Sequence, residues 1–344
     1  MKNLPCNENQ AYLVTDRLMR KYLSGVDVEE GYLLYHGKFT CFSDARYFSA
    51  ARVKLEKVGV NAVLFLGLES IKDYLDKNGI TELFVDFDST TVTEYNLLKD
   101  FGISISDSSS VLNKIRAIKS DAEITSIKKA CEIAQKAYHT AIKEVKKGIT
   151  EKWLKDKLES LMLSYGAEGT SFETIVAFGA NAAVPHHQTG DTVLKDNMVV
   201  LVDMGCKIDG YCSDITRTAF FGIPDKKFID CYNAVLDANV TAEEEITLGT
   251  LTNVADNYAR EVLRKKSLDK YFTHSLGHGV GLLIHEYPTL SSKRSDKLIN
   301  GMVFTIEPGV YIDGEFGIRI EDTVLLNNGK VERLFDDDKK LLIL

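Results

Sequence analysis

The stretch from Leu201 to Thr218, LVDMGCKIDGYCSDITRT, constrains the fold more than any other part of the chain. Two largely apolar runs flank Asp209-Gly210, a dipeptide that strongly favours a two-residue β-hairpin turn. Each run nevertheless carries an aspartate, Asp203 or Asp214. Acidic residues are depleted in strands, and an unpaired buried carboxylate is costly. The pattern therefore predicts a hairpin that has a chemical reason to hold two acids.

The register of this hairpin follows from the length of its turn. A two-residue turn sets Asp203 opposite Thr216 and Asp214 opposite Gly205. Both carboxylates then share one face as diagonal neighbours, with their backbones roughly 7–8 Å apart. A solvated pair of acids on a surface hairpin is the ordinary alternative, and this stretch alone leaves it open.

A second acidic hairpin, FTIEPGVYIDGEFGIRIEDTV, occupies the C-terminal third. With a three-residue loop at 313–315, Glu307 lies directly opposite Glu321. A two-residue loop would instead place the two glutamates on opposite faces. The pairing of Glu307 with Glu321 also depends on Pro308, because proline cannot donate to a β-ladder and often accompanies a change of register.

Histidines lie between the hairpins in HSLGHGVGLLIHEYP and before them in NAAVPHHQTG. Glycines surround His278, as is common where the backbone approaches a ligand closely. The H-E-x-x-H zinc pattern fails, because Thr289 stands where the second histidine would be. A lone histidine is more often structural than a ligand, so these candidates depend on the acids beside them.

Convergence of the four acids, Asp203, Asp214, Glu307 and Glu321, would create a metal site. Four carboxylates in one partly buried place cannot all stay ionised without compensating charge. Two divalent cations would balance them, with a neutral histidine completing the ligands. Oxygen ligands with one imidazole favour Mn²⁺, Co²⁺ or Fe²⁺ over structural zinc. Dinuclear sites of this kind activate water for attack on a carbonyl carbon.

The chain divides into two expected domains, residues 1–115 and 116–344. The first alternates strands and helices and predicts a small α/β domain. A helix begins the second, with Ser120 and Glu123 as a capping box and Gly148 as its stop. Hairpins and helices without a βαβ rhythm then predict an α+β domain on a curved antiparallel sheet.

Composition narrows the class of protein. A hydrophobic content of 44% and a charged content of 27% are typical of a globular protein. The net charge of −8 argues against a nucleic-acid or anionic-membrane partner. Six cysteines without a C-x-x-C pair predict free thiols, and no apolar run suits a signal peptide or a membrane span. We expect a cytoplasmic protein.

The motifs SFETIVAFGANAAVPHH, VDMGCKIDGYCSDITRT, GHGVGLLIHEYP, FTIEPGVY and GIRIED occur in one order along the chain. In that order they resemble the M24 pita-bread metallopeptidases, most closely the Xaa-Pro aminopeptidase and Xaa-Pro dipeptidase (prolidase) group. The resemblance covers residues 120–344. Residues 1–115 resemble a shortened creatinase-type N-terminal domain.

The resemblance implies roles for the candidate residues. Five would bind metal: Asp203 one ion, His278 and Glu307 the other, and Asp214 and Glu321 both. Glu307 would also take a proton from the attacking water. His186 and His285 would contact the scissile region, with Arg319 beside the site. His187 has a weaker claim, and we interpret His274 and Glu286 as structural. Leu283 departs from the family pattern, in which an acid is frequent.

The resemblance also implies an activity. We expect an Xaa-Pro aminopeptidase with two divalent ions, manganese first and Co, Fe or Zn as alternatives, acting on peptides as a homodimer. An Xaa-Pro dipeptidase is the close alternative, and a non-catalytic peptide-binding module of the same fold a remote one. Methionine aminopeptidase is disfavoured by the additional N-terminal domain, and a metal-free creatinase-like enzyme by the complete ligand set.

Overall fold

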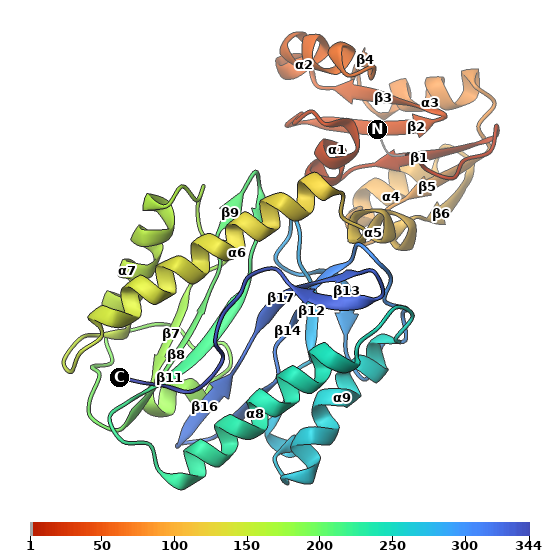
Figure 1. The fold of residues 1–344 in the computed structure, drawn as a ribbon. Helices are drawn as coiled ribbons and strands as arrows, with labels where there is room; N and C mark the ends of the chain where they lie inside the picture. Colours follow the sequence, from red (N-terminus) through yellow and green to blue (C-terminus); the bar gives the residue numbers. More distant parts are fainter. Residues whose placement is uncertain (1–2) are drawn as a thin grey trace. The chain divides into compact units, whose positions relative to one another are not determined.

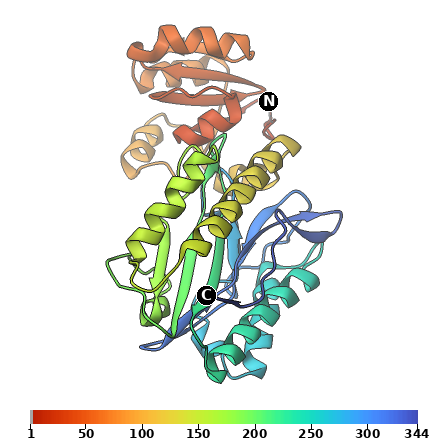
Figure 2. The ribbon, with the colours of Figure 1, turned by 60° about the vertical axis from the view of Figure 1, so that its left-hand side comes forward.

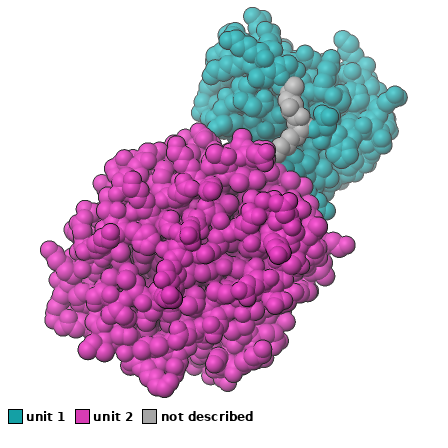
Figure 3. Space-filling model, in the orientation of Figure 1, with its two compact units in different colours: residues 1–115 teal, residues 116–344 magenta. Residues whose placement is uncertain are grey.

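A computed structural model describes residues 3–344. The chain separates into two compact units, residues 1–115 and 116–344, which Figure 3 colours separately. None of the helices formed by residues 3–344 is long and apolar enough to cross a membrane.

The first unit is built on a six-stranded mixed sheet of order β4-β3-β2-β1-β5-β6. The β1–β2 and β2–β3 pairs are antiparallel, whereas the β3–β4, β1–β5 and β5–β6 pairs are parallel. The strands are β1 (Gln10–Val14), β2 (Gly31–His36), β3 (Lys38–Ser43), β4 (Asn61–Leu64), β5 (Glu82–Val85) and β6 (Ser104–Asp107).

Helices cover both faces of this sheet, as expected for an α/β domain. Because side chains alternate along each strand, neighbouring residues enter different cores. Leu33 packs with Leu23 and Leu55, whereas Leu34 packs with Ile71 and Leu98. The helices are α1 (Arg17–Ser24), α2 (Ala45–Lys57), α3 (Leu68–Lys77), α4 (Val92–Lys99) and α5 (Ser109–Ala117), the last of which continues into the second unit.

The second unit has four long helices, α6 (Asp121–Ala141), α7 (Glu151–Ser164), α8 (Lys226–Glu245) and α9 (Thr252–Lys265). The capping box expected at Ser120 and Glu123 is present. The expected stop at Gly148 is wrong, because α6 ends at Ala141 and a 3-10 turn follows at Ile142–Glu144. The chain leaves the helix early so that Ile149 enters the core, and Gly148 bonds to the carbonyl of Leu194 instead.

Two antiparallel sheets carry the rest of this unit, with orders β19-β11-β8-β7 and β13-β12-β14-β17-β18. Among the strand pairs of residues 116–344, only β11–β19 is parallel. Helices α6 and α7 lie beside the first sheet, and α8 and α9 beside the second (Figures 1 and 2).

The strands of the first sheet are β7 (Ile175–Phe178), β8 (Met198–Met204), β11 (Ile215–Phe221) and β19 (Leu342–Ile343). Those of the second are β12 (Gly277–Gly279), β13 (Glu286–Leu290), β14 (Val303–Ile306), β17 (Asp322–Asn327) and β18 (Lys330–Arg333). Two short hairpins, β9 (Lys207–Ile208) with β10 (Tyr211–Cys212) and β15 (Gly309–Ile312) with β16 (Phe316–Arg319), extend from them, and short 3-10 turns lie at Gly179–Ala183 and Asp269–Tyr271. The expected α+β class is confirmed.

Candidate metal centre

The first acidic hairpin has the register expected from its turn. Ile208 pairs with Tyr211 across the turn, and Asp203 pairs with Thr216 further along the same ribbon. The ladder is interrupted between these two segments. A Cβ on Gly205 would lie only 1.9 Å from the carbonyl oxygen of Ser213, so the two backbones are too close there for any side chain. Glycine at 205 thus permits the bend at which Asp214 leaves the ladder.

The second acidic hairpin also keeps one register throughout. Ile312 pairs with Phe316 next to the three-residue loop, and Ile306 pairs with Asp322 beyond the gap. The same register on both sides sets Glu307 opposite Glu321, as expected. Pro308 interrupts the ladder without shifting it, because it lacks the N–H that a ladder needs.

The two hairpins join where their own ladders are interrupted. The backbone N–H of Glu321 donates to the carbonyl of Thr216 at 3.1 Å. The hydroxyl of Thr323 accepts from the N–H of Asp214 at 3.3 Å and donates to its carbonyl at 2.6 Å. Residues a hundred positions apart in the chain therefore become neighbours, which brings the acids of both hairpins into one place.

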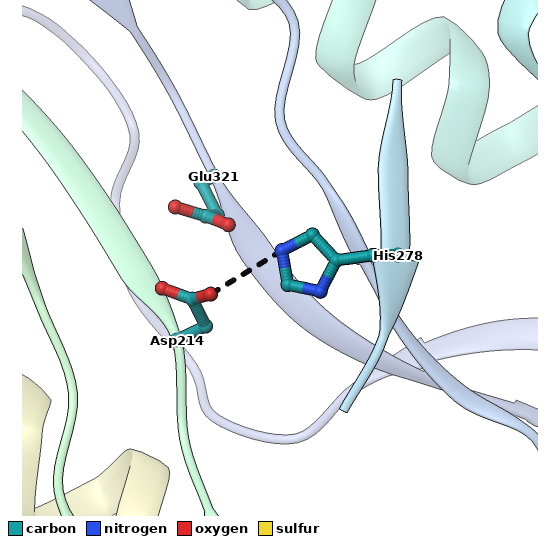
Figure 4. Close-up of side chains that lie close together, drawn as sticks. All are labelled: Asp214, His278 and Glu321. Atoms are coloured by element: carbon teal, nitrogen blue, oxygen red, sulfur yellow. Dashed lines mark ion pairs between the residues drawn. The ribbon is translucent and has the colours of Figure 1, made fainter. Parts of the chain in front are cut away.

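Three potential ligands point toward one another at this junction (Figure 4). One ligand atom each from Asp214, His278 and Glu321 lie within 4.8 Å of one another. The Nε2 atom of His278 is 3.5 Å from Asp214 Oδ2 and 3.4 Å from Glu307 Oε1. Thr216 donates to Glu321 Oε2 at 2.6 Å and thereby orients that carboxylate.

His278 reaches this junction from β12, in the middle of a glycine-rich run. A Cβ on Gly277 would lie 1.9 Å from the carbonyl oxygen of Thr305, and one on Gly279 would lie 2.4 Å from that of Tyr287. Only glycine allows β12 to fit this closely between its two neighbours. The glycines seen in the sequence therefore serve the packing of the strand that carries the imidazole.

The fourth acid, Asp203, is held by Arg319. Arg319 Nη2 donates to Asp203 Oδ2 at 2.7 Å, its Nη1 to the hydroxyl of Tyr311 at 2.8 Å, and its Nε to the hydroxyl of Thr216 at 2.9 Å. Both charged side chains are nearly buried. Tyr311 was not recognised in the sequence, because only the fold brings its hydroxyl to the guanidinium.

Burial shifts the pKa of several ionisable groups at the junction. Burial, followed by the charge of Glu321, raises the pKa of Asp214 well above its ordinary range. Burial also raises the pKa of Glu307 to about 8, although Arg319 opposes the shift. The pKa of His278 falls to about 4, mainly through burial. Without a bound cation, these shifts favour protonated carboxyl groups at Asp214, Glu307 and Glu321 and a neutral imidazole at His278.

The residues present fit divalent metal ions. Asp203 Oδ1 and Asp214 Oδ1 are buried, and no hydrogen-bond donor among residues 3–344 reaches them. Buried acceptors are normally satisfied, so two orphaned carboxylate oxygens indicate a missing cation. A set of carboxylates with one neutral imidazole has the hardness that Mn²⁺, Co²⁺ or Fe²⁺ prefers.

A cavity of about 530 Å³ opens above these groups. All five expected metal-binding residues line it, and so do His186, His285 and Arg319. The His285 ring stands edge-on to that of His278, with centroids 4.2 Å apart. The structure thus brings together every residue that the sequence singled out for metal or substrate.

Two further histidine candidates, His274 and His187, have different surroundings. His274 lines the cavity. Its Nε2 atom forms a hydrogen bond of 2.9 Å with the hydroxyl of Tyr311, and its Nδ1 atom lies 3.9 Å from Glu307 Oε2. We interpreted His274 as structural, but this position also places it beside the acid cluster. His187 instead bonds to buried Glu151 at 3.0 Å. Glu151, which the sequence did not reveal, also accepts from the N–H groups of Phe178 and Gly190 and so holds the loop that carries His186.

Comparison with known proteins identifies the family. The model of metallopeptidase family M24 matches residues 125–328, and that of the creatinase/prolidase N-terminal domain matches residues 6–118. The chain belongs to metallopeptidase family M24. This membership confirms the expected pita-bread architecture and implies divalent metal ions. An uncharacterized peptidase of Staphylococcus aureus is 39% identical over 296 residues, which are 83% of this chain and 84% of the relative.

Solved structures of M24 proteins resemble the whole chain. An Xaa-Pro dipeptidase from Bacillus anthracis has a TM-score of 0.91 and 33% identity over 97% of this chain and 95% of its own. An X-Pro aminopeptidase from Thermotoga maritima has a TM-score of 0.85 and 30% identity over 97% of both chains. A prolidase from Pyrococcus furiosus has a TM-score of 0.85 and 34% identity over 95% of this chain and 96% of its own.

Proposed function

We propose that this M24 peptidase is an Xaa-Pro aminopeptidase, which hydrolyses the bond between an N-terminal residue and a following proline. The observation that carries the proposal is the convergence of four carboxylates and one imidazole in a cavity that two more histidines line. Likeness to the Thermotoga maritima X-Pro aminopeptidase over the whole chain supports it.

In this proposal Asp203, Asp214, His278, Glu307 and Glu321 hold two divalent ions, with Mn²⁺ preferred by the hard donor set. When bound, the ions supply Lewis acidity toward a carbonyl and lower the pKa of water. The protein supplies the framework: Thr216 orients Glu321, and Arg319 fixes Asp203. These contacts leave the remaining carboxylate oxygens free to face the cavity.

The chain's own residues then handle the substrate and the protons. Glu307 accepts a proton from the attacking water at a carboxylate oxygen and returns it to the leaving nitrogen. His186 and His285 donate to the oxygen that becomes negative in the tetrahedral transition state. Their position on the cavity wall, beside and not within the acid cluster, suits this division of labour.

The choice of an aminopeptidase rests on the charges of the cavity. A dipeptide places its C-terminal carboxylate directly after the proline, so a dipeptidase needs a free cation there. Among the described residues that line the cavity, Arg319 is the one lysine or arginine, and Asp203 already binds it. A peptide that continues beyond proline carries no charge at that point and needs no such partner.

Xaa-Pro dipeptidase is the second candidate, and the structural resemblance favours it. The Bacillus anthracis protein at a TM-score of 0.91 and the Pyrococcus furiosus protein are both named for that activity. Dipeptidase activity would require another cation to reach the substrate carboxylate when the peptide binds.

The test compares Ala-Pro with Ala-Pro-Ala, using Ala-Ala-Ala as the control without proline and Mn²⁺-loaded protein throughout. We expect kcat/KM for Ala-Pro-Ala to exceed that for Ala-Pro by about tenfold or more, as expected when a carboxylate loses water without gaining a partner. The reverse ranking would identify a dipeptidase. Loaded protein that binds but cleaves neither peptide would support the non-catalytic binding module.

Two accompanying proposals concern the setting of the enzyme. We propose a homodimer on the family resemblance alone, to be checked by light scattering of the Mn²⁺-loaded protein. We also propose a reducing, cytoplasmic setting, because all six cysteines are free and five of them are buried. A monomeric mass, or export of the protein from the cell, would contradict these proposals.

A further inference from the structure

A buried ion cluster lies directly behind His285. Glu286 follows His285 in the chain and is the first residue of β13, but unlike His285 it does not line the cavity. Its carboxylate is buried to 1% exposure and meets two cations. Lys119 Nζ lies 2.7 Å from Oε1, and Arg116 Nε lies 3.1 Å from Oε2.

The two cations come from the segment that enters the second unit. Arg116 lies in the last turn of α5, and Lys119 lies between α5 and α6. This segment is itself fixed, since the N–H of Lys119 donates to Gly301 at 2.8 Å and Ile118 forms a bridge with Met302. Glu286 is therefore anchored to a segment that is itself bound to the backbone of residues 301 and 302.

The loop around His285 is shaped to fit this carboxylate. A Cβ on Gly281 would lie 2.3 Å from Glu286 Oε1, so only glycine leaves room for it. The carbonyl of Gly281 accepts from the N–H of Cys212 at 2.8 Å, which ties the other end of the loop to the first acidic hairpin. The segment 281–286 is thus held at both ends.

The His285 ring has little else to hold it. Within residues 3–344 the ring contacts His278 edge-on but makes no hydrogen bond. Its position is therefore set by its backbone, and that backbone is set by Glu286. A displacement of about 1 Å in a group that contacts the reacting atoms can cost about a hundredfold in rate.

We propose that Glu286, held by Arg116 and Lys119, is the positioning residue that places the His285 imidazole against the substrate. The inference rests on the proposed function insofar as His285 acts on a scissile bond. Loss of the ion cluster should move the imidazole while leaving the acid cluster intact, because none of its three members approaches a metal-binding carboxylate closely enough to form a hydrogen bond.

The test uses E286Q, which keeps the shape of the side chain and removes its charge, in the Mn²⁺-loaded full chain. We expect kcat to fall about tenfold or more with KM and metal content unchanged. In an H285A background the same substitution should change kcat by less than about twofold, because its target is gone. K119M should behave like E286Q, and K119R should recover most of the rate.

A second readout does not depend on activity. With selectively labelled histidines, the His285 imidazole NMR resonance, assigned by its absence in H285A, should shift or broaden in E286Q. An unchanged resonance, or an equal loss of kcat with and without His285, would overturn the proposal and leave a structural role. Failure of the wild-type protein to cleave any Xaa-Pro peptide would overturn the proposed function instead, and the NMR comparison would still decide the positioning role.

Discussion

Replacing Glu307 with glutamine should stabilise the metal-free protein and abolish its activity when metal is present. Burial raises the pKa of Glu307 to about 8 from an ordinary value of 4.5. The folded metal-free protein therefore keeps a proton that the unfolded chain releases above pH 4.5. Since the folded-state pKa is raised, the stability linked to this proton is complete below pH 4.5 and is lost as the pH rises toward 8.

The magnitude follows from the width of that interval. A pH of 7 lies 2.5 pH units above the ordinary pKa of 4.5. At about 1.36 kcal/mol per pH unit, the free energy of unfolding of the metal-free protein is lower than at acidic pH by roughly 3 kcal/mol. At pH 5 the same arithmetic gives less than about 1 kcal/mol. Glutamine needs no such proton, and it can still accept from Thr305, which donates to Glu307 Oε1 at 3.2 Å.

Urea unfolding of the wild type and E307Q in excess chelator, at pH 7 and pH 5, measures the difference. The single tryptophan, Trp153, lies in α7, so its fluorescence reports on the metal-binding unit alone. We expect E307Q to be more stable at pH 7 and nearly equal at pH 5. Saturating Mn²⁺ should reverse the order, because binding stabilises the folded wild type selectively. A metal-free wild type that is as stable as E307Q at pH 7 would refute the reasoning.

Three further substitutions separate metal binding from rate. Asp214→Ala or Glu321→Ala should lose both bound metal and activity, with kcat/KM falling by more than about a thousandfold, because each removes a carboxylate that we propose both ions share. Metal analysis after gel filtration checks this, and full metal occupancy in either variant would contradict it. His186→Ala should keep its metal but lose about a hundredfold in kcat, as expected for a donor to a developing negative charge; an unchanged kcat would remove His186 from the mechanism.

Short-range signals in the sequence determined both acidic hairpins. The Asp209-Gly210 turn and the three-residue loop at 313–315 each set a register, and both registers persist beyond the interruptions of their ladders. Turn length fixes pairing locally, but only the structure shows that the second loop has three residues and that Pro308 does not shift the register. The capping box at Ser120 is predictable for the same reason, because its partners lie within one helical turn.

The end of α6 shows where local signals fail. Gly148 is a good helix terminator, yet the helix ends at Ala141, and the residues that follow contact distant segments: Gly148 bonds to the carbonyl of Leu194, and Ile149 is buried. Propensity is a weak preference that tertiary packing often overrides.

The sequence by itself thus determined the family motifs and the pairing of the first acidic hairpin, and it limited the second hairpin to two registers, of which the structure has the one with a three-residue loop. Only the tertiary structure decided what joins those hairpins. Asp214 meets Glu321 because Thr216 and Thr323 connect two ladders at their interruptions. Tyr311, Glu151 and the cluster around Glu286 likewise depend on side chains that meet across long separations in the chain. Periodicity and turn chemistry act over a few residues, whereas hydrogen bonds and ion pairs such as these form only after distant segments have packed together.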